Sequence, residues 1–145
     1  MTNRLMLLAA LLLICAGTAK ADGTDPIETR QAGQDLFAAT YAGIRFVVTA
    51  KGDVKTLERP ARAMARWMKQ FPTQFPKGSE EGHNTKALPA VWSDSEGFLK
   101  TANEMVDATT RLAELAKAGD ADAVAAQVKA VGEVCDACHR EYRAR

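Results

Sequence analysis

Hydrophobic residues recur at intervals of three and four along four stretches of the chain, which is the spacing of one face of an α-helix. The first stretch lies within residues 25–52, the second within 53–71, the third within 93–119, and the fourth runs from 120 nearly to the C-terminus. The residues predicted to face inward are, in order, Gln34, Phe37, Tyr41, Ile44 and Val48; Leu57, Ala61, Met64 and Met68; Phe98, Ala102, Met105, Thr109, Leu112 and Ala116; and Val124, Val128, Val131, Cys135, Cys138 and Tyr142. No stretch alternates apolar and polar residues as a half-buried strand would.

Several residues at the ends of these stretches are typical of helix boundaries. Asp25 suits an N-cap, Pro26 suits the first helical position, and Glu28 completes a pattern like a capping box. Glycine favours helix ends, so Gly52 and Gly119 are expected to end the first and third helices.

Prolines limit the second helix and the segment after it. Pro60 lies inside the second stretch, so either its first turns bend or the helix begins there. Residues 71–89 (FPTQFPKGSEEGHNTKALP) are rich in Pro, Gly, Ser and Asn and are predicted to form a long loop. Amphipathic helices joined by short connections and one long one predict an all-α, antiparallel four-helix bundle.

The start of the chain has the pattern of an export signal. Arg4 supplies a positive charge, residues 5–17 are apolar, and Ala19 and Ala21 place small residues where a signal peptidase reads them. The apolar run is too short for a comfortable permanent membrane span. The alternatives are a buried core helix and a lipid anchor at Cys15.

We therefore predict a signal peptide over residues 1–21 and a single mature domain over residues 22–145, located in the periplasm. Removing the signal takes away Cys15 and leaves one more acidic than basic residue. Such a near-neutral balance argues against a nucleic-acid-binding protein. The mature chain has no second long apolar run, so no stable membrane anchor is expected.

The two remaining cysteines belong to the sequence Cys135-Asp136-Ala137-Cys138-His139, a C-x-x-C-H motif. This motif is the attachment signature of c-type haem, because two thiols at this spacing can bond to the two vinyl groups on one edge of the porphyrin. The adjacent His139 is then placed as the axial iron ligand. The motif predicts one covalently attached haem c per chain.

Three other interpretations of the motif were weighed. A redox-active C-x-x-C is expected beside a strand, and no strand is predicted. A structural zinc site needs four ligands, so His83 of the long loop would have to fold back to join the motif. A disulfide between Cys135 and Cys138 would leave His139 unexplained.

Helical phase supports haem attachment independently. Cys135 and Cys138 continue the inward stripe of the last helix, so both thiols are expected to face the bundle interior. The macrocycle would then lie among the helices, with one edge reaching solvent.

Several segments together make the chain similar to the cytochrome c′ family over essentially its whole mature length. They are Arg30-Gln31, Phe75-Pro76-Lys77-Gly78-Ser79, Thr85-Lys86-Ala87-Leu88-Pro89, Val91-Trp92-Ser93-Asp94, Gly97-Phe98 and the C-terminal CDACHREYR. The resemblance implies a four-helix bundle in which Cys135 and Cys138 hold the haem and His139 binds the iron.

The resemblance also implies roles for residues outside the motif. Arg30 and Gln31 match positions that contact the haem propionates, and Phe75 matches an aromatic residue near the distal pocket. Arg143 lies four residues after His139, so the two are expected on the same helical face. It matches a basic family position beside the axial histidine, where a cation tunes the iron. The alternatives are a solvated charge for Arg30, core packing for Phe75 and a plain surface arginine for Arg143.

The residue at position 34 departs from the family pattern. Low-spin relatives carry a methionine ligand there, and high-spin members carry a non-ligating, usually apolar residue. Gln34 is neither, and since an amide is a poor iron ligand we expect an open or weakly occupied sixth position. On an inward stripe the Gln34 side chain needs a partner, which could be a bound ligand, a water, a loop or solvent.

These observations lead to a functional hypothesis. The chain is expected to be a periplasmic cytochrome with a high-spin, five-coordinate haem that binds diatomic gases and exchanges single electrons with redox partner proteins. The alternative is a low-spin electron carrier in which Met64, Met68 or Met105 is the sixth ligand, although methionines at helical spacing are typical of cores. A helical interaction module without haem is a third possibility.

Two further expectations concern activity and assembly. No acid–base pair or nucleophile stands out, so no enzyme is predicted. The family resemblance implies a homodimer through the first two helices. A basic band on the second helix (Arg59, Arg62, Arg66 and Lys69) could be a solvated face or a docking surface.

Overall fold

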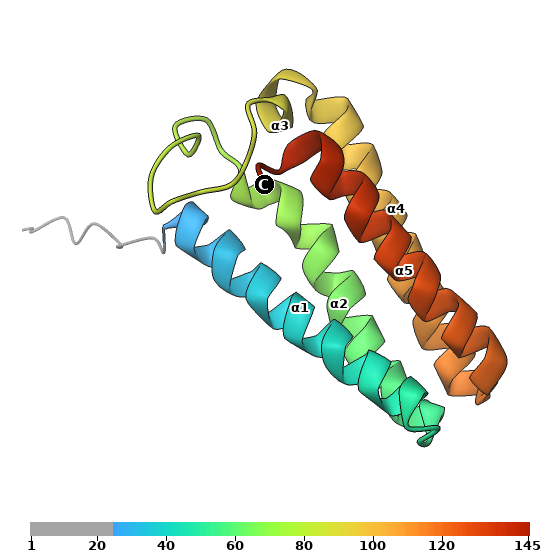
Figure 1. Cartoon of the computed structure of the whole chain (residues 1–145). Helices are drawn as coiled ribbons and strands as arrows, with labels where there is room; N and C mark the ends of the chain where they lie inside the picture. The colour runs from blue at the N-terminus through green and yellow to red at the C-terminus, as the bar shows by residue number, and fades with distance from the viewer. Residues whose placement is uncertain (1–24) are drawn as a thin grey trace, which may run out of the picture.

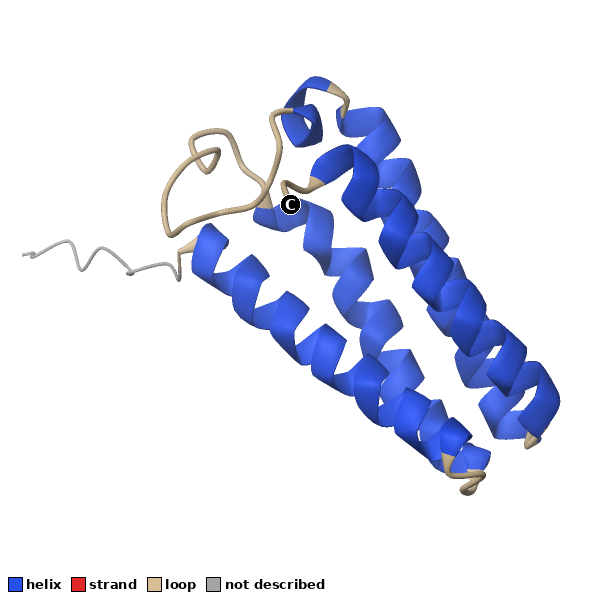
Figure 2. Cartoon of the chain, in the orientation of Figure 1, coloured by secondary structure: helices blue, strands red, loops and turns tan. Residues whose placement is uncertain are grey.

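The structure, a computed structural model, describes residues 25–145, which form helices, turns and loops (Figure 2). The predicted signal peptide, residues 1–21, lies outside the described residues. The long helices are α1 (Pro26–Thr49), α2 (Glu58–Gln70), α4 (Ser95–Ala118) and α5 (Ala121–Tyr142). Shorter helical segments are η1 (Val54–Leu57), η2 (Phe71–Gln74) and α3 (Ala90–Ser93).

The four long helices run alternately up and down, which confirms the predicted antiparallel bundle (Figure 1). Helix α4 packs extensively against both α2 and α5, whereas α1 contacts α2 and α5 more lightly. The start of α1, the long loop, α3 and the C-terminus lie at one end of the bundle (Figure 1). We call this the open end, and the opposite end, where α1 leads into η1 and α4 into α5, the closed end.

Capping residues form the predicted boundaries. The carboxylate of Asp25 accepts two backbone N–H groups of the first turn of α1, and the carboxylates of Asp94 and Asp120 each accept one at the starts of α4 and α5. Gly119 ends α4 with φ of 80°, a left-handed conformation that favours glycine. These caps satisfy N–H groups that have no partner inside the helix.

The end of α1 differs from the prediction. The helix stops at Thr49, and the left-handed residue after it is Lys51 (φ 54°) rather than Gly52. The Gly52 N–H instead donates to the carbonyl of Val47 at 2.9 Å, which satisfies one of the last carbonyls of the helix.

Pro60 lies in the first turn of α2, where a missing backbone N–H removes no helical hydrogen bond. The residues before it form η1 instead of bending a longer helix. The segment 71–89 is mostly loop as predicted, although it opens with the turn η2. The one-turn helix α3 that follows this segment was not predicted.

The core confirms most of the predicted inward faces. The inward residues of the second and third predicted helices are all buried, and so are Val124, Val128, Val131 and Tyr142 of α5. Phe37 and Ile44 of α1 are buried too. Five predicted inward residues are only half-buried: Gln34, Tyr41, Val48, Cys135 and Cys138. All five belong to α1 or α5, so the core is least complete between these two helices.

Candidate functional site

The two thiols of the C-x-x-C-H motif lie on the inner face of α5. Cys135 and Cys138 are both free, half-buried and packed against the hydrophobic core. Burial and then the neighbouring Cys135 raise the pKa of Cys138 to about 11, and burial and then Asp136 raise the pKa of Cys135. Both groups are therefore neutral thiols at physiological pH, facing the interior as the helical phase predicts.

His139 follows at the edge of an open hollow of about 530 Å³ near the C-terminus. Protein atoms that exclude water from part of the ring, and then the positive charge of Arg143, lower the pKa of His139. The imidazole is therefore neutral at pH 7 and keeps a nitrogen lone pair for a metal. The lining of the hollow comprises Asp136, His139, Arg140, Arg143, Ala144 and Arg145, which makes it positively charged.

Arg143 lines this hollow from an extended segment of backbone, not from the helix that the sequence predicted. The sequence suggested that Arg143 shares a helical face with His139, but α5 ends at Tyr142. Arg143 is extended and forms an isolated antiparallel bridge with Ala87 of the long loop. The backbone pairing of the C-terminus therefore sets the position of Arg143, and both side chains still line the same hollow.

Contacts of Tyr41 set the register between α1 and α5. The Tyr41 hydroxyl donates to the carbonyl of Val128 at 2.9 Å. A Cβ at position 132 would lie 2.8 Å from this hydroxyl, so Gly132 admits the Tyr41 side chain. The two helices are antiparallel, so moving from Tyr41 toward the N-terminus of α1 follows the same direction as moving from residues 128–132 toward the C-terminus of α5. Seven residues span about 10 Å in either helix. Gln34 therefore lies level with residues 135–139.

Gln34 contacts a methionine of α2. The amide Nε2 of Gln34 lies 3.8 Å from the sulfur of Met68, which is a weak hydrogen-bond acceptor. Within residues 25–145, the Gln34 side chain makes this one hydrogen bond. Met64, Met68 and Met105 are all buried in the hydrophobic core. Of these three methionines, Met68 is the one that contacts Gln34.

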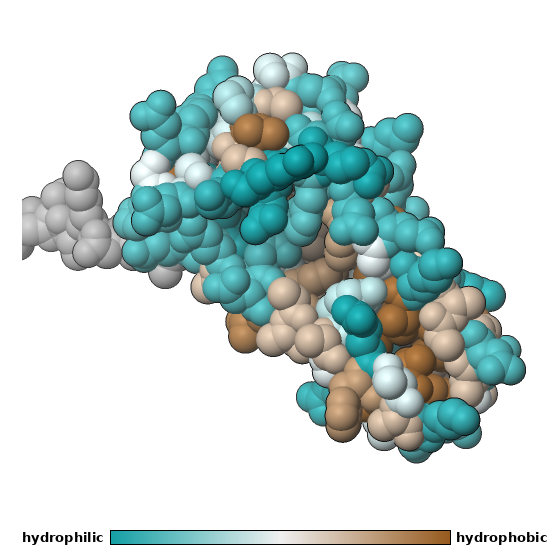
Figure 3. Space-filling view, viewed as in Figure 1, coloured by the Kyte–Doolittle hydropathy of each residue, from teal (hydrophilic) through white to brown (hydrophobic). Residues whose placement is uncertain are grey.

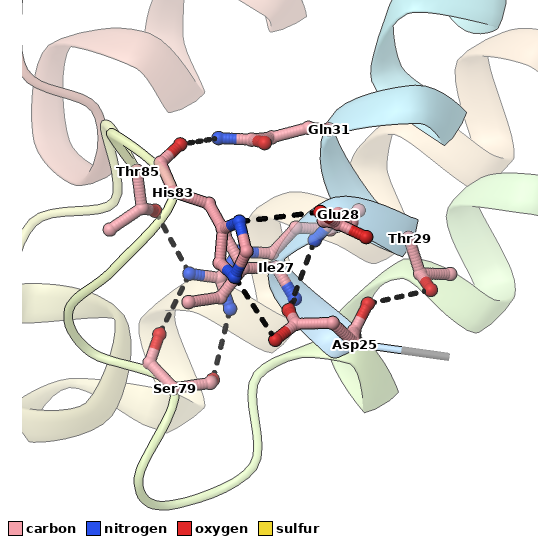
Figure 4. Close-up of polar contacts among 9 residues, drawn as sticks. Asp25, Ile27, Glu28, Thr29, Gln31, Ser79, His83 and Thr85 are labelled. Carbon is pink, nitrogen blue, oxygen red and sulfur yellow. Dashed lines mark hydrogen bonds and ion pairs between the residues drawn. The ribbon is translucent and has the colours of Figure 1, made fainter. Parts of the chain in front are cut away.

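Arg30 connects the first helix to the long loop, and Figure 4 labels two of its loop partners, Ser79 and Thr85. Its Nη1 donates to the Gln74 carbonyl at 3.0 Å and the Ser79 hydroxyl at 2.9 Å, and its Nη2 donates to the Ser79 carbonyl at 2.8 Å and the Thr85 hydroxyl at 2.9 Å. The Arg30 side chain is 4% exposed, so the solvated charge offered as an alternative does not describe it. Burial lowers the pKa of Arg30, with the charges of Asp25 and Glu80 opposing the shift.

Gln31 and His83 make a second connection between α1 and the loop (Figure 4). The Gln31 amide donates to the His83 carbonyl at 2.9 Å. The two imidazole nitrogens of His83 lie 3.4 Å from a carboxylate oxygen of Asp25 and 3.3 Å from one of Glu28. His83 is exposed, and among residues 25–145 no group of three or more His, Cys, Asp or Glu side chains could hold a metal ion. The zinc interpretation needs His83 beside the motif, and the structure places the His83 imidazole beside Asp25 and Glu28 instead.

Phe75 belongs to an aromatic cluster at the open end. Its ring stands edge-on to Phe71 at 5.0 Å, to Phe98 at 4.9 Å and to Trp92 at 5.9 Å between ring centroids. The guanidinium carbon of Arg30 lies 4.5 Å from the centre of the Phe75 ring. Phe75 thus packs in the core and also forms part of the surroundings of Arg30.

The structure gathers the predicted site residues into two groups. On α5 and its C-terminal extension, Cys135 and Cys138 lie on the inner face, and His139 and Arg143 line the open hollow. Arg30, Gln31 and Phe75 share the contact between α1 and the loop. Sequence reasoning missed the loop partners of Arg30, Ser79 and Thr85, although both lie in segments that carry the family resemblance. It also missed the hydrogen bond of Tyr41, for which the sequence holds no local signal.

The groups present fit a covalently attached haem. Two neutral thiols at the C-x-x-C spacing suit addition to two vinyl groups, and the neutral imidazole of His139 suits an iron ligand. The arginines around the hollow beside His139 would add positive charge near a cofactor that carries carboxylates.

Comparison with known proteins supports the same conclusion. The sequence model of the family described as Cytochrome C′ matches residues 25–143. The cytochrome c′ of Rhodospirillum rubrum is 32% identical over 146 residues, covering 98% of this chain and 99% of the relative.

Two solved structures share the fold. A cytochrome c′ described as having an unusual ligand-controlled dimer dissociation has a TM-score of 0.77 at 29% identity, covering 83% of this chain and 95% of its own. The nitric oxide complex of a leucine-to-alanine mutant of the Alcaligenes xylosoxidans cytochrome c′ has a TM-score of 0.75 at 28% identity, covering 83% and 94%. The chain therefore belongs to the cytochrome c′ family, whose cofactor is covalently attached haem c.

Proposed function

We propose that this cytochrome carries a high-spin, five-coordinate haem, binds diatomic gases such as nitric oxide and carbon monoxide, and exchanges single electrons. The observation that carries the proposal is the position of Gln34, level with the motif on the facing helix. An amide there supplies no good iron ligand, whereas a methionine or histidine would.

Residues of α5 are assigned the attachment and the axial ligand. Cys135 and Cys138 would hold the haem through thioether bonds, and His139 would bind the iron. The charge of Arg143 disfavours imidazolate character in His139 and so tunes the iron. When bound, the haem supplies an iron that binds a small ligand and accepts or gives one electron.

Residues of α1 and the loop are assigned to the edge of the haem. Arg30 and Gln31 remain the candidates for contacting the propionates, with Phe75 packed beside Arg30. The four hydrogen bonds of Arg30 to the loop occupy both Nη groups and fix the guanidinium, so a nearby propionate would meet a positioned positive charge rather than unused Nη donors.

Gas binding has support from a structural neighbour, because a leucine-to-alanine mutant of the Alcaligenes xylosoxidans cytochrome c′ was solved as a nitric oxide complex. Electron exchange is proposed because haem iron can accept or give one electron. The basic band of α2 is a candidate docking surface for redox partner proteins; Arg59, Arg66 and Lys69 are exposed, and Arg62 pairs with Glu58 at 3.0 Å. We assign no substrate turnover to the site.

A periplasmic location follows from the export pattern of residues 1–21 and from the chemistry of the cofactor, since thioether attachment of haem takes place beyond the inner membrane. Within residues 25–145 no helix is long and apolar enough to cross a membrane.

Assembly as a homodimer has support from the outer face of α1. Ala32, Leu36, Ala39, Gly43, Phe46 and Ala50 are spaced by four, three, four, three and four residues, and all are exposed. Leu36 is 71% exposed and Phe46 73%, although α1 already buries its opposite face in the bundle. A helix that is apolar on two opposite faces suits packing against a second copy, and Figure 3 shows apolar side chains along α1.

Absorption spectra test the proposed coordination. The purified protein should show covalently bound haem, a high-spin ferric spectrum, and clear changes when the reduced protein is exposed to carbon monoxide or nitric oxide. A low-spin ferric spectrum with a methionine–iron charge-transfer band would support the alternative electron carrier instead. Met68 is the methionine to test in that case, because its sulfur lies beside Gln34.

The axial ligand and the dimer have separate tests. His139→Ala should keep the haem attached and change its spectrum; an unchanged spectrum would show that another group binds the iron. Leu36→Glu should lower the mass measured by sedimentation to that of a monomer. Leu99→Glu is the matched control, because Leu99 is an exposed leucine on α4.

A further inference from the structure

The amide of Gln34 is poorly matched by its protein surroundings. It is half-buried, and its Nε2 is directed at the sulfur of Met68 at 3.8 Å. A thioether is a weak hydrogen-bond acceptor, so this contact recovers little of the free energy that a half-buried amide loses on leaving water. The nearby α1 glutamine, Gln31, instead donates to a carbonyl oxygen at 2.9 Å.

The position of Gln34 relative to the motif brings this poorly satisfied amide to the height of a group attached there. The Tyr41 contacts with Val128 and Gly132 place Gln34 level with residues 135–139 on the facing helix. A group attached through Cys135 and Cys138 would lie at the same height along the bundle as the Gln34 side chain. The amide and the thiols also belong to the half-buried set where the packing between α1 and α5 is least complete.

We propose that the Gln34 amide donates a hydrogen bond to the small ligand that occupies the sixth position of the haem iron. This bond makes the site favour anionic ligands over neutral gases. The inference rests on the proposed five-coordinate haem and adds a selectivity to it.

The selectivity follows from the charge of the acceptor. A hydrogen bond to an ionised acceptor is roughly twice as strong as a neutral one, and more so in a site from which water is excluded. Cyanide bound to ferric iron presents a negatively charged nitrogen to the amide, whereas carbon monoxide bound to ferrous iron presents a nearly neutral oxygen. Met68 loses little when the amide turns to a better acceptor, because its sulfur is buried with apolar neighbours.

Gln34→Leu is the main test, because it keeps the side-chain volume nearly unchanged and removes the N–H donors. The affinity of the ferric holoprotein for cyanide should fall about tenfold, the loss expected for one hydrogen bond to a charged group, and the affinity of the ferrous protein for carbon monoxide should change less. The infrared C–O stretch of the carbon monoxide complex should move to higher wavenumber, because a donor near the oxygen favours back-donation from the iron.

Two further variants sharpen the result. Gln34→Glu keeps the shape but brings an acceptor-only carboxylate, so cyanide affinity should fall further than in Gln34→Leu. Gln70→Leu is the matched control, because Gln70 is an exposed glutamine at the end of α2, and its cyanide and carbon monoxide affinities should equal those of the unaltered protein.

The outcomes separate this inference from the function on which it rests. Unchanged cyanide affinity in Gln34→Leu, or equal weakening of cyanide and carbon monoxide, would overturn the hydrogen bond while leaving five-coordinate haem intact. If the unaltered protein is low-spin and takes up neither ligand, the proposed function fails and the selectivity fails with it.

Discussion

The two ends of the bundle are built from different kinds of side chain. At the closed end Leu57, Leu112, Ala116 and Val124 are 3% exposed or less and contact other apolar residues. At the open end a buried arginine holds the loop, two thiols are half-buried, and arginines surround His139. In Figure 3 hydrophilic residues cover the end that carries the loop and the C-terminus, and apolar residues gather over the other half.

This contrast shows how one bundle divides two tasks. Close packing of apolar side chains at the closed end stabilises the fold and needs no cofactor. The open end leaves thiols, an imidazole and an amide incompletely packed, so that a large cofactor and a small ligand can meet them. The changes below test this division, from the largest expected effect to the smallest.

Removing both thiols should abolish attachment at the open end. The double variant Cys135→Ser and Cys138→Ser should carry no covalent haem, because no thiol then remains in residues 22–145 to form a thioether. Haem staining after denaturing electrophoresis measures this directly. Covalent haem retained by the double variant would contradict the assignment.

Truncation at the closed end should affect stability without affecting the haem. Leu112 is fully buried, so Leu112→Ala should lower the free energy of unfolding by about 2–5 kcal/mol. Denaturant unfolding measures the loss, and the visible spectrum should stay the same. Leu99→Ala is the control, because Leu99 is 49% exposed. A comparable loss in the free energy of unfolding there would show that burial does not decide the effect.

Replacing Arg30 should loosen the open end. Arg30→Lys keeps the charge but cannot make the four hydrogen bonds to Gln74, Ser79 and Thr85. We expect a loss of about 2 kcal/mol in the free energy of unfolding. Hydrogen exchange should become faster in residues 76–86 and stay unchanged in α4; equal acceleration in both would point to general destabilisation.

A change at Gln34 should alter the iron more than the fold. Gln34→Met places a thioether level with the motif, and the ferric spectrum should become low-spin with a methionine–iron charge-transfer band. Because the site is half-buried and the volumes are similar, stability should change by less than about 1.5 kcal/mol. A spectrum that stays high-spin would show that position 34 does not face the iron.

The smallest effect concerns Tyr142, which joins the end of α5 to the cap of α4. Its hydroxyl donates to the carboxylate of Asp94 at 2.8 Å, and this hydrogen bond raises the pKa of Tyr142 to about 12. The resulting stabilisation is complete below the ordinary tyrosine pKa of about 10 and is lost as the pH rises toward 12, since the phenolate cannot donate. The free energy of unfolding, measured in roughly one-unit pH steps between pH 9 and pH 12, should fall with pH in the unaltered protein. This fall should be absent in Tyr142→Phe. The same slope in both proteins would assign it to another group.

Much of the fold could be predicted because its signals are local. The inward stripes, the caps at Asp25 and Asp120, and the end of α4 at Gly119 each depend on residues within a few positions of one another. The end of α1 was wrong because Lys51 takes the left-handed conformation that glycine usually takes. The short helix α3 was missed because one turn has no periodicity to detect.

The candidate site was predictable only in part, because only some of its contacts are between residues close together in the sequence. The motif at Cys135, Cys138 and His139 is contiguous, so its phase on α5 follows from the chain alone. Arg30, in contrast, meets partners 44 to 55 positions away, and the path of the loop decides which they are. Arg143 lines the hollow because its backbone pairs with Ala87, which the helical pattern did not indicate.

The sequence by itself determined that this protein is a bundle of four amphipathic helices with a c-type haem motif near its C-terminus, because helical periodicity and the spacing of two thiols are properties of neighbouring residues. The tertiary structure alone decided that Gln34 lies level with that motif and beside Met68, that Arg30 is buried against the loop, and that α1 is apolar on an outer face as well as an inner one. Those features depend on how the helices are placed against one another, and that placement results from packing over the whole chain rather than from any single segment.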